Sequence, residues 1–128
     1  MFVVAVARLG FDTSHVTSLK EKRRIRLQIT QRIRHRFPVA IAEIESNDDH
    51  SRLVLGLAVV SNSSRHAASM MDTVIRQIEK MYIAPMELRE REIINLGVLS
   101  DPFWTMQDHD EEDWEQFKAL TEELHNEQ

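Results

Sequence analysis

The stretch SLKEKRRIRLQITQRIRHRF, residues 18–37, combines an apolar ladder with a high density of positive charge. It contains eight of the sixteen Lys and Arg residues in the 128-residue chain. Ile25, Ile29 and Ile33 recur every four residues, a spacing that places them on one face of a helix, and Leu19 and Phe37 extend the ladder at its ends. The stretch therefore predicts a helix that docks on a core through one face and presents cations on the others.

Both ends of this helix carry a recognisable signal. Ser18 and Glu21 fit a capping box, in which the Ser18 hydroxyl accepts from the Glu21 amide and the Glu21 carboxylate reaches back to the Ser18 amide. Pro38 ends the helix, because a residue before proline avoids helical backbone geometry. The helix is therefore predicted to lie within residues 18–37.

Four segments around this helix predict strands, at residues 1–11, 39–45, 52–60 and 86–96. The first and third are apolar on both faces, which is typical of central strands, whereas the last is more polar and indicates an edge. Between the third and fourth strands a second amphipathic helix follows the possible caps of SNSS at residues 61–64. Its apolar stripe consists of Ala67, Ala68, Met71, Val74, Ile75, Ile78 and Met81.

The order strand, helix, strand, strand, helix, strand predicts an α+β fold, the ferredoxin-like βαββαβ sandwich, over residues 1–100. Right-handed crossovers place both helices on one face of a four-stranded antiparallel sheet. The other face then contains apolar side chains from two central strands without a helix to cover them. We expect either the C-terminal tail or a second subunit to cover that face.

The charge changes sign after residue 100. Residues 1–100 hold 15 Lys and Arg against 11 Asp and Glu, whereas residues 101–128 hold one Lys against ten acidic residues. This acidic tail is predicted to include a short helix, because its apolar residues from Trp114 to Leu124 fit one side of a helix. Trp and Phe are uncommon in disordered acidic tails. The expected docking anchors are Phe103, Trp104, Trp114 and Phe117.

Several segments of residues 1–98 resemble the YlxP-like proteins, small bacterial proteins of unassigned function. They are SLKEKRR at 18–24, RF at 36–37, AEI at 42–44 and LGLAVVS at 55–61. The resemblance implies a ferredoxin-like fold and, from the position of the family's genes near those of translation and ribosome maturation, a link to RNA or the ribosome. It implies no catalytic residues. The chain departs from the family pattern by placing Arg26 before Leu27 and by adding the acidic tail.

The basic helix is the candidate binding element, and its expected partner is RNA or a ribosomal particle. The alternative is a solvated helix face, or one paired with the chain's own acids. Strand 52–60 has no aromatic residue, which disfavours base stacking on the sheet. The candidate phosphate-binding residues are Lys20, Lys22, Arg23, Arg24, Arg32, Arg34 and Arg36.

Other functional classes find little support in the sequence. With no Cys, three Gly and scattered His residues, the chain has no nucleophile elbow, Gly-rich phosphate loop or metal-ligand spacing, so we expect no enzyme activity and no cofactor. No apolar run approaches the roughly 20 residues that span a bilayer, and a cytoplasmic protein without membrane contact is expected. Two hypotheses stay open: an RNA-binding module whose acidic tail competes for the basic helix, and a homo-oligomer, such as a dimer, formed through the uncovered sheet face.

Overall fold

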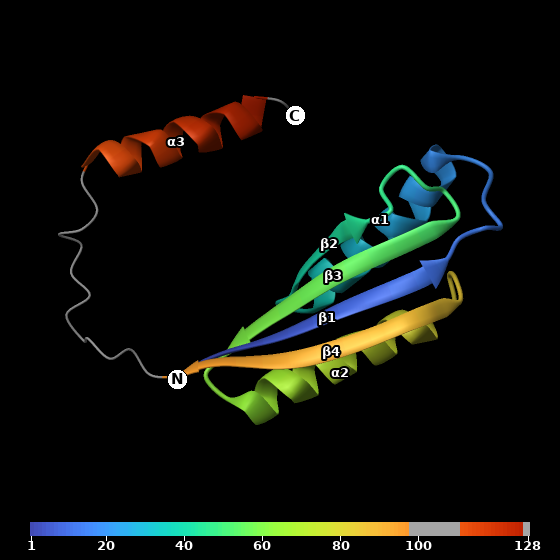
Figure 1. The fold of residues 1–128 in the computed structure, drawn as a ribbon, viewed down its shortest axis with the longest axis horizontal. Helices are drawn as coiled ribbons and strands as arrows, with labels where there is room; N and C mark the ends of the chain where they lie inside the picture. Colours follow the sequence, from blue (N-terminus) through green and yellow to red (C-terminus); the bar gives the residue numbers. More distant parts are fainter. Residues whose placement is uncertain (98–110, 127–128) are drawn as a thin grey trace. The chain divides into compact units, whose positions relative to one another are not determined.

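The computed structural model describes residues 1–97 and 111–126 and is shown in Figure 1. The chain divides into two units, Met1–Val98 and Leu99–Gln128, which are described separately. The elements of the first unit are β1 (Phe2–Asp12), α1 (Leu19–Arg36), β2 (Ala40–Glu45), β3 (Arg52–Ser61), α2 (Ser64–Lys80) and β4 (Met86–Gly97). The second unit contains α3 (Glu111–Asn126).

The four strands form one antiparallel sheet in the order β2-β3-β1-β4. Both α1 and α2 lie on the same side of this sheet (Figure 1). This arrangement confirms the predicted ferredoxin-like fold, with β1 and β3 in the centre and β4 at an edge. The observed bounds of the strands differ from the predicted ones by only one residue at either end.

The core lies between the sheet and the two helices. Alternate residues of β1 from Val3 to Phe11 are buried, as are Leu53, Leu55, Leu57 and Val59 of β3. The helices cover them with two stripes of apolar side chains. These stripes are Ile25, Ile29 and Ile33 from α1, and Ala67, Met71, Val74, Ile75 and Ile78 from α2. The predicted helix ladders are thus confirmed in their central parts.

The N-terminus of α1 differs from the prediction in two details. Ser18 is the N-cap, and its Oγ accepts from the Glu21 amide at 3.2 Å, as the capping box requires. The Glu21 carboxylate, however, accepts from the Thr17 amide at 2.9 Å instead of the Ser18 amide. Leu19 was predicted to extend the apolar ladder, but it is 48% exposed because it begins the helix beyond the edge of the core.

The second unit contributes the acidic helix that was expected within residues 101–128. α3 begins at Glu111, three residues before the predicted apolar stripe, and its residues 115–124 are exposed. Within the ranges 1–97 and 111–126, no helix has the length and apolar character needed to cross a membrane.

Candidate nucleic-acid interface

The outer face of α1 carries a shallow depression of about 340 Å³ in which three of the predicted binding residues meet. Lys20, Arg23 and Arg24 surround it, and all three are exposed. In the part of the chain that the structure describes, none of these three side chains makes a hydrogen bond or an ion pair. The remaining lining residues are Leu27, Gln28 and Gln31, so no carboxylate faces this outer depression.

A second concavity, which we name the interhelix groove, lies between the end of α1 and the end of α2 and measures about 300 Å³. Arg32 and Arg36 are four residues apart and therefore share one face of α1. Four basic residues line this groove, and, as in the outer depression, no carboxylate does. It is lined by Arg32, His35, Arg36, Gln77, Lys80 and Met81.

Arg36 is held in place by residues on both sides of the interhelix groove. Its Nη1 donates to Oε1 of Gln77 on α2 at 3.2 Å. Its guanidinium carbon also lies 5.5 Å from the centroid of the Phe37 ring, within the range of a cation–π contact. A guanidinium carries five N–H donors, so most of them stay available for a ligand.

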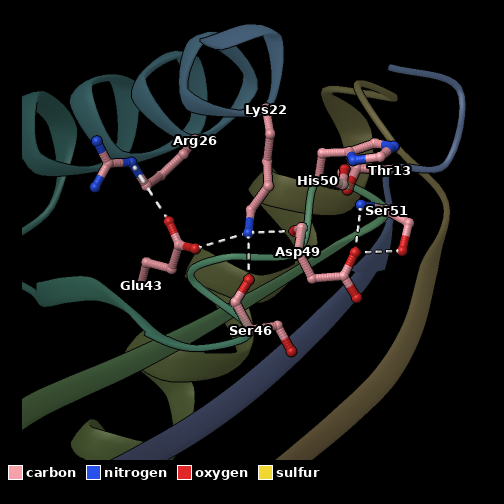
Figure 2. Close-up of polar contacts among 8 residues, drawn as sticks. All are labelled: Thr13, Lys22, Arg26, Glu43, Ser46, Asp49, His50 and Ser51. Atoms are coloured by element: carbon pink, nitrogen blue, oxygen red, sulfur yellow. Dashed lines mark hydrogen bonds and ion pairs between the residues drawn. The ribbon is translucent and has the colours of Figure 1, made fainter. Parts of the chain in front are cut away.

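Lys22, by contrast, is buried and points inward (Figure 2). Its Nζ donates to the carbonyl oxygens of Ser46 at 2.6 Å and Asp49 at 2.7 Å, and it lies 2.9 Å from Oε1 of Glu43. Two carbonyl acceptors and one carboxylate, with which it forms an ion pair, therefore enclose the ammonium group. Lys22 was predicted to bind phosphate, and that prediction is wrong, because the enclosed ammonium cannot reach a ligand.

Glu43 on β2 holds a second cation of α1. Nε of Arg26 lies 3.7 Å from Oε2 of Glu43, whose side chain is only 10% exposed. Arg34 also faces β2, where its Nη2 donates to the carbonyl oxygen of Ile41 at 2.6 Å. One flank of α1 therefore uses its charges to attach the helix to β2, whereas the outer face leaves its charges in solvent.

The acidic residues of α2 are neutralised on the β4 side of that helix. Asp72 lies 3.1 Å from Nε of Arg91, and Glu79 lies 2.8 Å from Nη1 of Arg89. These pairs engage both carboxylates of α2 with cations of the sheet edge. As a result, the exposed face of α1 and the interhelix groove retain a positive field.

The loops at the end of β1 and between β2 and β3 are ordered by local hydrogen bonds. The hydroxyl and amide of Ser51 donate to Asp49 at 2.6 and 2.9 Å, and they lower the pKa of that carboxyl group. The hydroxyl and amide of Ser14 likewise lower the pKa of Asp12. Buried Thr13 donates through Oγ1 to the carbonyl of His50 at 2.7 Å and connects the two loops (Figure 2). These contacts are structural and lie outside the two concavities.

Arg8 occupies the middle of the sheet face that the two helices leave open. Its Nε donates to Glu90 of β4 at 2.9 Å and its Nη1 donates to Glu45 of β2 at 3.1 Å. Hydrogen bonding and charge attraction from Glu90, followed by those from Glu45, raise the pKa of Arg8 above its ordinary value. The guanidinium thus bridges both edge strands across the open face.

An apolar row lies on the open face beside this charged centre. Val4 pairs in register with Val60 of β3 on one side and with Ile94 of β4 on the other. Val60 is 65% exposed and Ile94 is 41% exposed. Phe2, two residues before Val4 on β1, is also exposed. Apolar side chains predicted for the outer side of the central strands are therefore present, and Val60, Val4 and Ile94 form one row of them.

The predicted tail anchors are only partly within the described residues. Phe103 and Trp104 lie outside them, and of Trp114 only the helical backbone position in α3 is described. Phe117 lies on α3 and is 59% exposed. Among the residues that the structure describes, no group of three His, Asp or Glu side chains is placed to bind a metal ion.

The α2 side of the interhelix groove was missed in the sequence. Neither Lys80 nor Gln77 was among the predicted binding residues. Each is an ordinary residue of a polar helix face, and nothing in the local pattern distinguishes it from a solvated residue. The available signal was topological: two helices on one sheet face are neighbours, so the outward residues of both contribute to one surface.

Comparison with solved structures gives similar folds at low sequence identity. A de novo designed protein with a ferredoxin fold is 17% identical, covers 85% of this chain and 96% of its own, and has a TM-score of 0.43. A mutant of SnoaB, a cofactor-independent oxygenase from Streptomyces nogalater, is 11% identical, with coverages of 78% and 98% and a TM-score of 0.36. At these TM-scores neither structure bears on what the chain binds or catalyses.

A search of curated proteins finds no match to this sequence. The model of one family, DUF503, matches residues 4–91, which include β2, β3, both helices of the first unit, and parts of β1 and β4. That family is described as a protein of unknown function. The chain therefore belongs to the DUF503 family.

Proposed function

We propose that the protein is a non-enzymatic binding module for RNA, which it contacts through phosphates along the outer face of α1. The observation that carries this proposal is the pair of concavities on α1, about 340 and 300 Å³ in volume, that are lined by cations and contain no carboxylate. The contributing cations are Lys20, Arg23, Arg24, Arg32, Arg36 and Lys80.

The spacing of these cations suits an extended polyanion. Arg24 and Arg32 are eight residues apart on one helix, which corresponds to about 12 Å along its axis at 1.5 Å per residue. Several phosphates of a strand can thus be contacted at once. Because no Phe, Tyr or Trp side chain lines either concavity, the contacts are to the backbone of the RNA and are independent of its sequence.

The resemblance to YlxP-like proteins supports a more specific partner. The segment SLKEKRR at 18–24 supplies Lys20, Arg23 and Arg24, all of which line the outer depression. A family link to genes of translation favours ribosomal RNA or a ribosomal particle in the cytoplasm as the partner. Lys22 lies in the same segment, but its burial assigns it to the fold.

The test is a salt-dependent binding measurement with the full chain and a fluorescently labelled single-stranded RNA. Neutralising two cations in the variant Arg23→Gln/Arg24→Gln removes up to two phosphate contacts. For single strands the slope of log K against log salt is about −0.7 per phosphate contact, so the variant is expected to lower the slope magnitude by about 1.4. Fluorescence anisotropy between about 50 and 200 mM salt measures both slopes.

Arg52→Gln is the matched control, since Arg52 is exposed and begins β3 instead of lying on α1. It is expected to leave the slope unchanged within about 0.3, which is less than half of the slope change that one phosphate contact produces. Absence of RNA binding by the full chain at about 50 mM salt, or equal slopes for all three proteins, would overturn the proposal.

We further propose that the acidic tail competes with RNA for this cationic surface. The support is charge alone: residues 101–128 hold ten acidic residues against one Lys. Neutralising three exposed carboxylates of α3, in Glu115→Gln/Glu122→Gln/Glu123→Gln, is expected to increase RNA affinity at low salt. Gln116→Ala on the same helix is the control. An affinity that falls, or that does not change, contradicts the competition.

A second candidate function is homo-oligomerisation through the open sheet face, and the apolar row of Val60, Val4 and Ile94 favours it. If two copies meet there, the wild-type chain sediments as a dimer and Val60→Asp converts it to a monomer. Tyr82→Asp is the control, because Tyr82 is 88% exposed and follows α2 instead of lying on the sheet. A wild-type monomer at high micromolar concentration contradicts this candidate.

A further inference from the structure

We infer that the interhelix groove is a binding site for a phosphate monoester, and that in RNA it captures a terminal phosphate. This inference rests on the proposed RNA binding, and it adds a distinct ligand group for one part of the surface. The groove volume of about 300 Å³ is at the lower end of the range for small-molecule sites.

The cations of the groove converge from two elements instead of following one helix. Arg32 and Arg36 are on one face of α1, and Lys80 comes from the last turn of α2. Gln77, three residues before Lys80, bonds to Arg36 and fixes the guanidinium between the helices. The cations of the groove therefore surround one position, whereas the cations of the outer depression all lie along one helix.

A focused arrangement of this kind suits a monoester better than an internal phosphate. An internal phosphodiester carries one negative charge, whereas a phosphate monoester carries about 1.5 to 2 at neutral pH and three strong acceptor oxygens. Two arginines and a lysine can donate to all three oxygens at once. Met81 adds an apolar surface beside the cations, on which the attached sugar or base can rest.

The nearby carboxylates do not oppose an anion in this position. Glu79 is adjacent to Lys80 in sequence, but its carboxylate pairs with Arg89 at the β4 side of α2. Asp72, two turns earlier on α2, pairs with Arg91. Within residues 1–97 the groove therefore faces no carboxylate that lacks a cationic partner of its own.

The experiment compares two labelled RNA strands of the same short sequence, one with a 5′-phosphate and one with a 5′-hydroxyl. The full chain is expected to bind the phosphorylated strand about tenfold more tightly, the effect of one additional charge-assisted interaction. Lys80→Gln is expected to remove this preference. Because Lys80 also belongs to the proposed phosphate-contacting surface, the variant is expected to bind both strands more weakly, and the ratio of the two affinities is the quantity compared with the wild type. Lys80 is exposed at the end of α2, so the variant is expected to fold.

Arg76→Gln is the matched control, since Arg76 is exposed on α2 one turn before Lys80 and does not line the groove. It is expected to keep the tenfold preference. Equal affinities of the wild-type chain for the two strands would overturn the inference, even if RNA binding itself is confirmed.

A second measurement separates this inference from the proposed function. Nucleoside 5′-monophosphate and inorganic phosphate are titrated into the full chain, and the NMR signals of the Gln77 side-chain amide and the His35 ring are followed. Shifts that saturate with the nucleotide and disappear in Lys80→Gln support the site even if no RNA strand binds. Saturation by inorganic phosphate at the same concentration identifies a free phosphate as the ligand and contradicts capture of a strand end. No shift with either compound contradicts the site.

Discussion

Lys20 and Lys22 lie two residues apart in the same run of charges, but only Lys20 extends into solvent. The difference arises from the helix period: residue 22 is three residues before Ile25 and therefore lies close to the buried face. A lysine there is buried only if its ammonium finds acceptors. The carbonyl groups that it finds belong to a loop 24 and 27 residues further along the chain, so its role could not be predicted from the local sequence.

Replacing this lysine is expected to destabilise the fold strongly. Lys22→Met keeps the length of the side chain but leaves Glu43 without its closest cation and the carbonyls of Ser46 and Asp49 without this donor. A loss of about 3 kcal/mol in the free energy of unfolding is expected, because one partner of a buried pair is left alone. Urea denaturation measures it. Lys20→Met is the control and is expected to stay within about 0.5 kcal/mol of the wild type. Equal stabilities of the two variants would show that the contacts of Lys22 contribute little.

Asp49 gives the fold a defined sensitivity to acid. Ser51 lowers its folded-state pKa, so the carboxylate contributes stability above its unfolded-state pKa of about 3.9, and this contribution is lost as the pH falls through the lower folded-state value. Asp49→Asn cannot titrate and is expected to show a flatter decline of unfolding free energy between about pH 5 and pH 2.5. Ser51→Ala is expected to lie between the two. Parallel profiles for all three proteins would contradict this account.

At the scale of elements, the sequence predicted all six helices and strands of the first unit, and the predicted bounds of the four strands and of α1 agree with the observed ones within one residue. Strong periodicity in α1 and α2 and alternation in β1 made this possible, because burial on one face imposes the same pattern that the sequence displays. The partner of the Glu21 carboxylate was predicted one residue too late. The Glu21 carboxylate can accept from the Ser18 amide or from the Thr17 amide with the side chain in the same place. Only the backbone path at Thr17 decides which of the two amides it meets.

The start of α1 is expected to depend on its cap. Ser18→Ala removes the side-chain acceptor for the Glu21 amide, and this is expected to lower the free energy of unfolding by about 1 kcal/mol. Thermal unfolding followed by circular dichroism measures the change. Ser69→Ala is the control, because Ser69 is an exposed residue inside α2 and alanine is favourable there. A Ser18→Ala variant as stable as the control would mean that Glu21 and Thr17 alone fix this helix end.

At the scale of the whole molecule, the buried core of the described residues lies in the first unit. Every member of the core cluster lies between Val3 and Ile78. A fragment of residues 1–98 is therefore expected to fold with the circular dichroism spectrum of an α+β protein and to unfold in one cooperative transition. A fragment that lacks this transition would show that the fold requires residues beyond 98.

The candidate interface could be predicted only in part at this scale. The cationic face of α1 was evident from the sequence, because charge and periodicity occur in one segment. The interhelix groove was not, since it depends on the distance between residues 32–36 and 77–81, which is set by the packing of both helices on the sheet. The apolar side chains of the open sheet face were predicted, but its charged centre, in which Arg8 bridges two carboxylates, was not, because Glu45 and Glu90 are remote from Arg8 in sequence.

The position of the Lys22 ammonium also limits how the loop between β2 and β3 can vary in length within this family. Exposed hairpin loops generally accept inserted residues at little cost. Between β2 and β3, however, the carbonyls of Ser46 and Asp49 both bond to one nitrogen, and Ser46 adopts a left-handed backbone with φ of 59°. An insertion at Asn47 or Asp48, although both are exposed, would displace one carbonyl from that nitrogen. Relatives that retain a lysine at this position are therefore expected to share a loop of the same length.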